Sequence, residues 1–278
     1  MKRVFAAALL FAAGPALAAG YDDFSRGVNA NNRGDADTAI SSFTAALNAS
    51  DLAPGYVPNA YFGRARAYLR KDKCAEALSD LDATITLKAD NVDAYILRAA
   101  ANACLSKPDA ALSDFNVAVG LRPSAAVYEA FASFQWNYGF FAQAAENYAQ
   151  AAKLAVKDSP HRPYILLWYA VSADRAGTLD QVKFAADVSA LDFDDWPAPI
   201  LDFYRGKATV DQVTREAASS DAQTATDQKC EADFYIGEWQ LARKNPDAAK
   251  PLLQAAVSEC PQNFIEYFAA KVELKRQP

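Results

Sequence analysis

The pattern of apolar and polar residues repeats along most of this chain at a fixed interval. The tetrapeptide Ala-Leu-Ser-Asp at positions 77–80 returns at positions 111–114, 34 residues later, and Arg64 returns as Arg98. A unit of this length accommodates two helices joined by a turn, and one such hairpin cannot bury its own apolar face. Stacked hairpins bury that face against one another, so the period predicts an all-α array of antiparallel helix pairs. Arrays of this kind generally act as binding surfaces.

Five copies of the pattern can be aligned by their small residues. The matched positions are Gly27, Gly34, Ala39, Phe43 and Ala46; Ala65, Tyr68, Ala77, Leu81 and Thr84; Ala99, Ala111, Phe115, Ala118 and Pro123; Ala132, Gly139, Ala144, Tyr148 and Ala151; and Gly237, Ala249, Leu253, Ala256 and Pro261. Small residues at matched spacings mark close contacts between helices, and large ones fill the spaces between them. The pattern resembles the tetratricopeptide repeat (TPR), which implies an all-α TPR solenoid of about five to six units, one of them degenerate.

This repeat frame predicts a single domain over residues 19–278. In chain order it predicts good repeats over about 20–157, a degenerate unit with extra helices over about 163–218, and a final repeat with a capping helix over about 229–276. A carboxylate among Asp192, Asp194 and Asp195 is expected to cap a helix that starts at Pro197. Residues 219–227 are polar and lack apolar periodicity, so they are predicted to form a mobile loop.

The N-terminus has the composition of a secretory signal peptide. Lys2 and Arg3 precede an apolar run at 4–13, and Ala16-Leu17-Ala18 follows as a cleavage site. The run is too short to span a membrane, and no later segment approaches the roughly 20 apolar residues that a span requires. No Cys lies near the cleavage point, which disfavours a lipid anchor. We therefore expect residues 1–18 to be removed and the mature chain to be periplasmic; a buried N-terminal helix is the alternative.

The charge balance disfavours nucleic acid as a partner. The formal net charge is -6, and removal of Lys2 and Arg3 with the signal peptide shifts it to -8. Phosphate contacts need clustered Lys and Arg, which an acidic solenoid does not offer. This charge favours solubility and basic partners.

The four cysteines support export. Cys74 and Cys104 are separated by 30 positions, as are Cys230 and Cys260. In the repeat frame each pair stands at neighbouring helix ends, so of three possible connectivities we expect disulfides 74–104 and 230–260. Metal ligation and redox chemistry are the alternatives, but close Cys pairs and a Cys-x-x-Cys motif are absent.

The last third of the chain resembles a narrower group. Trp196-Pro197-x-Pro199-Ile200 with Gly206, Phe234-Tyr235-Ile236-Gly237 and the segment 263–267 (Asn-Phe-Ile-Glu-Tyr) resemble the NlpI-like TPR proteins of bacterial envelopes. The resemblance implies an adaptor that holds cell-wall hydrolases or a protease near their substrates, often as a homodimer. This chain lacks the lipoprotein cysteine of that group.

Catalytic chemistry is not indicated, and no cofactor or metal is expected. His161 is the only histidine and lies in a Pro-flanked turn, where a solvated residue is the simpler interpretation. The sequence contains no nucleophile elbow, zinc-protease motif or phosphate-binding loop. The three aspartates at 192–195 lack the regular spacing of calcium ligands.

The TPR resemblance implies that the first helix of each pair lines a concave groove. The predicted groove residues are Asn59, Phe62, Arg66 and Arg70 in the second repeat, and Glu129, Trp136 and Asn137 in the fourth. Arg66 and Arg70 stand one turn apart and could hold a carboxylate such as a peptide C-terminus. Trp136 could serve as an aromatic anchor. The alternative is that the helix dipole alone favours Arg70 at a helix end and that Trp136 packs within its own repeat.

These observations predict an exported, non-catalytic scaffold that binds protein or peptide partners through the groove. The alternative is a binder of glycans, muropeptides or other small ligands that uses the aromatic-rich segment 164–169.

Overall fold

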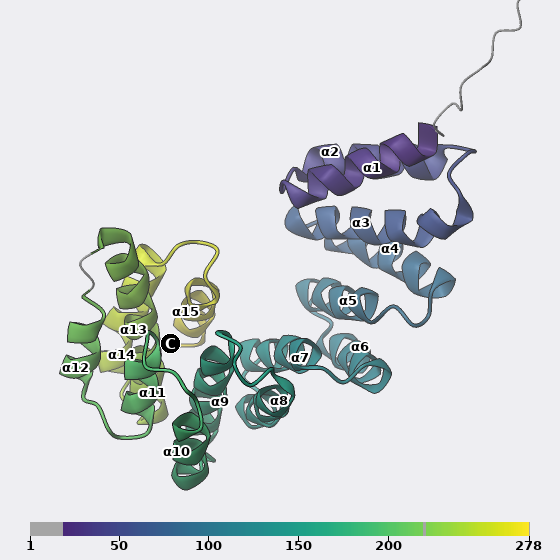
Figure 1. Cartoon of the computed structure of the whole chain (residues 1–278). Helices are drawn as coiled ribbons and strands as arrows, with labels where there is room; N and C mark the ends of the chain where they lie inside the picture. The colour runs from purple at the N-terminus through teal and green to yellow at the C-terminus, as the bar shows by residue number, and fades with distance from the viewer. Residues whose placement is uncertain (1–18, 219–220, 278) are drawn as a thin grey trace, which may run out of the picture. The chain divides into compact units, whose positions relative to one another are not determined.

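The computed structural model describes residues 19–218 and 221–277, and all of its regular structure is helical within those ranges (Figure 1). The helices are α1 (Ala19–Asn32), α2 (Ala36–Asn48), the short 3-10 helix η1 (Pro54–Tyr56), α3 (Val57–Arg70), α4 (Cys74–Leu87), α5 (Val92–Cys104), α6 (Pro108–Leu121), α7 (Ala125–Asn137), α8 (Phe141–Leu154), α9 (Arg162–Ala176), α10 (Gln181–Ser189), α11 (Ala198–Tyr204), α12 (Val210–Glu216), α13 (Ala222–Ala242), α14 (Pro246–Glu259) and α15 (Ile265–Arg276). The all-α prediction is confirmed. The predicted signal peptide, 1–18, lies outside the described residues.

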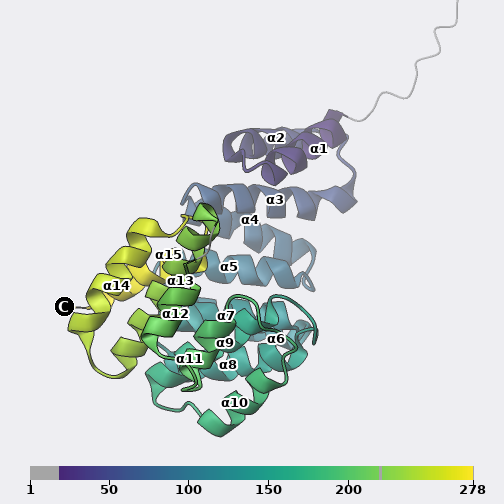
Figure 2. The same ribbon diagram turned by 60° about the vertical axis from the view of Figure 1, so that its left-hand side comes forward.

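Backbone contacts group the helices into two compact units, Met1–Leu121 and Arg122–Pro278. The sequence predicted one domain over 19–278 instead. Since each hairpin of a repeat array contacts only its neighbours, a regular period does not fix where an array divides. The first unit contains α1 to α6 as three consecutive helix pairs, and the second contains α7 to α15 (Figure 2).

The small residues of the first unit have the packing role that the pattern predicted. Phe43 of α2 is 1% exposed and lies against both Gly27 of α1 and Gly63 of α3. A Cβ on Gly27 would lie 2.8 Å from Cδ1 of Phe43, and one on Gly63 would lie closer still to the ring. A larger residue at either position would therefore displace the ring and separate the helices.

The exact repetition at 77–80 and 111–114 has an electrostatic counterpart. Arg64 of α3 donates from Nε and Nη2 to both carboxylate oxygens of Asp80 in α4, each at 2.8 Å. Arg98 of α5 makes the equivalent pair with Asp114 of α6, with its Nη2 at 2.6 Å. Both aspartates are 4% exposed. Each pair therefore links the two helices of one hairpin in the same way, one repeat apart.

Both predicted disulfides are present. Cys74 at the start of α4 is bonded to Cys104 at the end of α5, with the Cα atoms 6.2 Å apart. Cys230 of α13 is bonded to Cys260, just after α14, with the Cα atoms 5.0 Å apart. The first bond staples adjacent hairpins of the first unit, and the second closes the last helix pair.

The degenerate stretch departs from a regular hairpin stack. Helix α9 packs against α8 and then against α13, about 60 residues later, so that α10, α11 and α12 form an insertion beside this packing. Helix α11 begins at Ala198, with Pro197 in the capping position and no side chain bonded to the free amides. The predicted carboxylate cap is therefore wrong. A backbone bond from Ala198 N to the Asp195 carbonyl serves that turn instead.

Helix α13 begins earlier than predicted. Residues 222–227, expected within a mobile loop, form its first turns, while 219 and 220 lie outside the described residues. The side chain of Asp221 accepts a bond from the Thr224 amide at 2.8 Å, and Gln223 donates to Asp227 four residues on. A capping side chain and an i,i+4 contact are signals that apolar periodicity does not contain.

Helix α15 is tied to the rest of the second unit by buried charges. Arg175 of α9 bridges Glu238 of α13 and Glu273 of α15, and both carboxylates are 1% exposed. Arg276, which also pairs with Glu273, donates from Nη2 to the carbonyl of Trp136 at 2.6 Å. The C-terminal helix is thereby held against the end of α7.

Candidate functional site

The groove residues predicted in the first unit lie on α3. Asn59, Arg66 and Arg70 are exposed, and Phe62 is half-buried. Arg70 donates from Nη1 to the carbonyl of Asn31 at 2.8 Å, so its guanidinium ties α3 to the end of α1. The structure thus gives Arg70 a structural partner, and the proposed arginine clamp with Arg66 stays a prediction.

Trp136, predicted as an exposed anchor on α7, is a core residue. It is 1% exposed and stands edge-on to Trp168, with ring centroids 5.3 Å apart, and to Phe234 at 6.2 Å. The guanidinium of Arg276 lies 5.2 Å from its ring centroid. The expectation of an open aromatic anchor is therefore wrong, because the C-terminal helix covers this position. Asn137, the next residue, is exposed.

Glu129, the remaining predicted residue, borders a cavity of about 300 Å³ in the second unit. We call this the carboxylate cavity. Its apolar wall consists of Tyr148, Tyr164, Ile165, Trp168, Phe264 and Ile265. Its polar lining consists of Glu129, Ser133, His161, Glu231 and Glu266. Most of the lining comes from α7, α9, α13 and the start of α15, and Tyr148 comes from α8.

Two of the acidic residues in the cavity are almost fully buried. Glu231 of α13 is 7% exposed and accepts a hydrogen bond from Trp196 Nε1 at 2.9 Å, with the Tyr164 hydroxyl at 3.5 Å. Glu266 of α15 is 3% exposed and accepts from the Tyr235 hydroxyl at 3.0 Å. Neutral donors hold both carboxyl groups in place without neutralising them.

Burial raises the pKa of both carboxyl groups. Loss of solvent, aided by the nearby charge of Glu266, raises the pKa of Glu231 to about 8, although the bonds from Trp196 and Tyr164 oppose the shift. Burial also raises the pKa of Glu266. Near neutral pH the empty cavity therefore retains a proton that an exposed carboxyl would have lost.

The contrast with the other buried acids of the second unit is informative. Glu238 and Glu273 are each paired with an arginine of the same unit. In residues 19–218 and 221–277, Glu231 and Glu266 have hydrogen-bond donors but no Lys or Arg ion pair. Among the described residues, the cavity is thus where buried carboxyl groups lack a basic partner from the chain itself.

The rim of the cavity is open to a ligand. His161, in the turn before α9, has a side chain that is 63% exposed and lies with Nε2 2.6 Å from a carboxylate oxygen of Glu129. Ile265 on the opposite helix is 44% exposed. An incoming group would therefore meet an acidic and apolar entrance before it reached Glu231.

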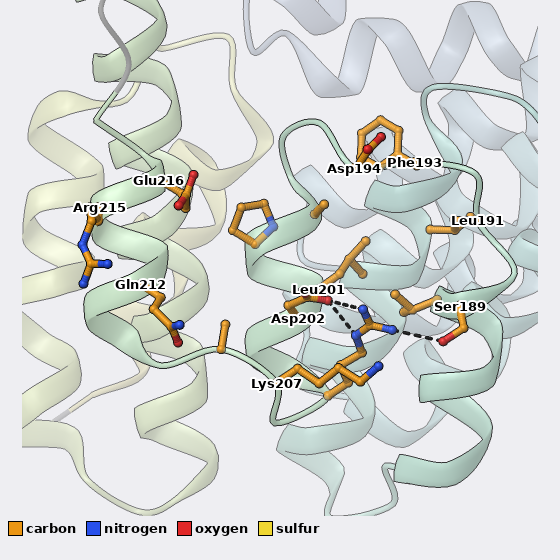
Figure 3. A pocket seen from close by; sticks show the side chains of 15 residues that line it. Ser189, Leu191, Phe193, Asp194, Leu201, Asp202, Lys207, Gln212, Arg215 and Glu216 are labelled. Atoms are coloured by element: carbon orange, nitrogen blue, oxygen red, sulfur yellow. Dashed lines mark hydrogen bonds and ion pairs between the residues drawn. The ribbon is translucent and has the colours of Figure 1, made fainter.

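A larger hollow of about 660 Å³ lies between α10, the 190–197 segment, α11 and α12 (Figure 3). Its central cation is already satisfied: Arg205 donates from Nε to Asp202 at 2.6 Å and from Nη1 to Ser189 at 3.1 Å. In Figure 3, Gln212, Arg215 and Glu216 project from α12, on the side of the hollow opposite Ser189 and Leu191. None of the buried carboxyl groups among the described residues lines this hollow, so the carboxylate cavity is the stronger candidate.

The aromatic segment 164–169 does not form an open platform. Ile165, Leu166, Leu167, Trp168 and Tyr169 are all at most 9% exposed. Tyr164 and Trp168 nevertheless reach the carboxylate cavity. The segment therefore contributes to a ligand site only as part of that wall.

Sequence reasoning found Glu129 and missed Glu231 and Glu266. A signal for Glu231 was present, because Glu231, Phe234, Tyr235 and Glu238 stand at i, i+3, i+4 and i+7 and share one helix face. Charged residues in register with a buried aromatic pair mark a polar site within the core. Glu266 carries no such signal, since its burial depends on where α15 docks.

Comparison with solved structures identifies the fold. A TPR protein from Parabacteroides merdae aligns with a TM-score of 0.54 at 15% identity, over 92% of this chain and 99% of that one. The C-terminal part of a TPR repeat-containing protein from Cytophaga hutchinsonii aligns with a TM-score of 0.57 at 16% identity, over 88% and 98% of the two chains. The sequence matches no protein-family profile.

These alignments, the consecutive helix pairs and the all-helical structure define the class of protein: the chain has the TPR fold. None of the helices described has the length and apolar character that crossing a membrane requires.

Proposed function

We propose that the protein is an exported, non-catalytic adaptor that binds protein or peptide partners along the first helices of its repeats. The observation that carries the proposal is the carboxylate cavity, to which the first helices α7, α9 and α13 each contribute lining residues. In the TPR resemblance these helices line the binding groove. The fold supports the same class of function, since stacked repeats create extended concave surfaces that such proteins use for binding.

Export and a role in the cell envelope are supported by the sequence. The pattern at 1–18 is that of a cleaved signal peptide. Two disulfides are typical of oxidising compartments such as the periplasm. The resemblance of the last third to NlpI-like proteins makes envelope hydrolases and proteases the first partner classes to test, and a homodimer a further possibility to measure.

Photo-crosslinking in living cells tests the adaptor function. A photoreactive residue is placed at Asn137 of α7 or at Phe268 of α15, with exposed Gln150 of α8 as the control. Asn137 and Phe268 are exposed and line a smaller cavity that shares Ser133, Trp168 and Ile265 with the carboxylate cavity. We expect a defined protein adduct from the first two positions and none from Gln150. The proposal fails if no adduct forms, or if all three positions give the same adducts.

A second candidate function is the binding of a small ligand such as a sugar or muropeptide. One observation favours it: the cavity has the volume and partly aromatic wall of a small-molecule site. A thermal-shift screen against sugars and muropeptides separates the two functions. Stabilisation by these compounds, without crosslinked protein, would favour the small-ligand role.

A further inference from the structure

We propose that the carboxylate cavity binds an organic cation, an ammonium or guanidinium group on an apolar stem. This inference rests on the proposed adaptor function and deepens it, because it names a lysine or arginine side chain as the group that a partner inserts. A free amine has the same chemistry and is the second possible source. The two sources are separated by the experiment below.

The first step of the argument is the missing counter-charge. Ionising a carboxyl group that is buried without a cation is costly. In the second unit, Arg175 pairs with both Glu238 and Glu273, and Arg276 pairs with Glu273. The unit leaves Glu231 and Glu266 without a basic partner in the described chain, and both border a cavity. A cation from outside would complete this site as Arg175 completes the other.

The second step is the chemistry of the walls. Trp168, Tyr164 and Tyr148 present aromatic rings to the cavity, and aromatic rings attract organic cations as well as apolar stems. Within the described residues, no group of three or more His, Cys, Asp and Glu side chains is arranged to hold a metal ion. Carboxylates combined with aromatic walls therefore favour an organic cation over a metal.

The third step is access. The cavity is reached past Glu129 and the exposed His161, so a further carboxylate stands at the entrance. The apolar rim residue Ile265 is 44% exposed and can contact the backbone or stem that carries the cation. The acidic balance of the whole chain also raises the local concentration of cationic ligands.

Proton exchange should accompany binding. The pKa of Glu231 is raised to about 8 in the empty cavity, so an entering cation displaces a proton below that pH. The titratable groups around Glu231 are Glu129, Tyr148, His161, Tyr164, Asp227, Tyr235 and Glu266. The affinity for a cationic ligand should therefore increase as the pH rises from 6 to 8.5. Deprotonation of an amine ligand would have the opposite effect, because it would lower the affinity as the pH rises.

The experiment uses the mature chain with its disulfides intact. The probes are n-pentylamine, agmatine and a short lysine-containing peptide, with n-pentanol and the norleucine version of the peptide as neutral controls. Binding is followed by calorimetry and by tryptophan fluorescence, since Trp168 lines the cavity and Trp196 bonds to Glu231. The variants are Glu231→Gln and Glu266→Gln, and Glu146→Gln on the exposed side of α8 is the matched control.

We expect the cationic probes to bind the wild type and the Glu146→Gln variant equally, and to bind each cavity variant at least tenfold more weakly. The neutral probes should show no such difference. Binding of the amines without the peptide would support the cation site with a free amine as its source, and would contradict insertion of a partner's side chain.

Absence of binding by every cationic probe at pH 8.5 would overturn the inference, as would equal affinity in wild type and both cavity variants. The adaptor function is judged separately. If crosslinks from Asn137 and Phe268 persist in Glu231→Gln and Glu266→Gln, the adaptor function stands although the cation site has failed. Circular dichroism confirms that each variant is folded.

Discussion

Glu231 of α13 and Trp196, which precedes α11, are joined by a hydrogen bond of 2.9 Å from the indole Nε1 to a carboxylate oxygen. The bond connects the inserted segment of the degenerate repeat to a first helix of the regular array. It also fixes a carboxyl group that is 7% exposed at the wall of a cavity. A residue of the insertion thus positions the group to which we assign ligand recognition.

The first prediction concerns pH and stability. The pKa of Glu231 is about 8 in the folded chain and about 4.3 in an unfolded one. Between these values the unfolded chain loses a proton that the folded chain keeps, so the contribution of Glu231 to stability falls as the pH rises, by at most about 1.4 kcal/mol per unit. Below pH 4 that contribution is fully present. Well above pH 8 neither the folded nor the unfolded chain holds this proton, so the contribution of Glu231 to stability no longer changes with pH.

The difference in free energy of unfolding between Glu231→Gln and the wild type should therefore shift in favour of the variant as the pH rises from 5 to 8.5, by more than about 2 kcal/mol. Urea unfolding followed by tryptophan fluorescence measures this, because Trp136, Trp168, Trp196 and Trp239 all belong to the second unit. Parallel pH profiles for the variant and the wild type would contradict the prediction.

The second prediction concerns the two disulfides. Each closes a segment of 30 residues, and its loss should cost roughly 3–4 kcal/mol in the chain-entropy model. Replacing Cys230 and Cys260 by serine should lower the midpoint seen by tryptophan fluorescence. Replacing Cys74 and Cys104 by serine should instead reduce the protection of backbone amides in α3 to α6 from hydrogen exchange. Equal shifts of both signals in both variants would show that the effect is not local.

The third prediction concerns the repeated ion pair of the first unit. Asp80→Ala leaves Arg64 half-buried without its carboxylate and should destabilise the unit by roughly 3–5 kcal/mol. Asp82→Ala is the matched control, because Asp82 also pairs with an arginine but its side chain is 56% exposed. That change should cost less than about 1 kcal/mol. Hydrogen exchange in α3 and α4 measures both, and equal losses of protection would refute the distinction.

The fourth prediction concerns processing. Expression of the whole sequence in a bacterium should give a periplasmic chain that begins at Ala19 or one residue later, as read by intact-mass spectrometry. Changing Ala18 to a bulky residue such as Phe should block cleavage, since this position requires a small side chain. A cytoplasmic chain that retains residues 1–18 would overturn the export proposal.

Much of the fold could be predicted from local patterns. Recurrence of small residues such as Gly27 and Ala77 predicts helices that approach closely, and the repeat frame places the cysteines at neighbouring helix ends. Both disulfides followed correctly. The start of α13 could not be predicted in this way, because its first turns depend on the Asp221 cap and on polar side-chain contacts.

The candidate site was less predictable, for a related reason. Trp136 lies about two turns after Glu129 in α7, and the sequence assigns both to one groove. Docking of α15 separates them: it buries Trp136 and leaves Glu129 at the mouth of a cavity. A helical pattern specifies which face is apolar, but it does not specify which later element will cover that face.

The sequence by itself determined the helical hairpins and their repeat length and favoured one pairing of the cysteines, because these depend on contacts between near neighbours along the chain. The structure then established that pairing. Only the tertiary structure decided that Glu231 and Glu266 meet in one cavity, with Arg175 and Arg276 committed to other carboxylates. The exposure and charge of a buried group depend on residues far away in the chain, and no local pattern encodes them.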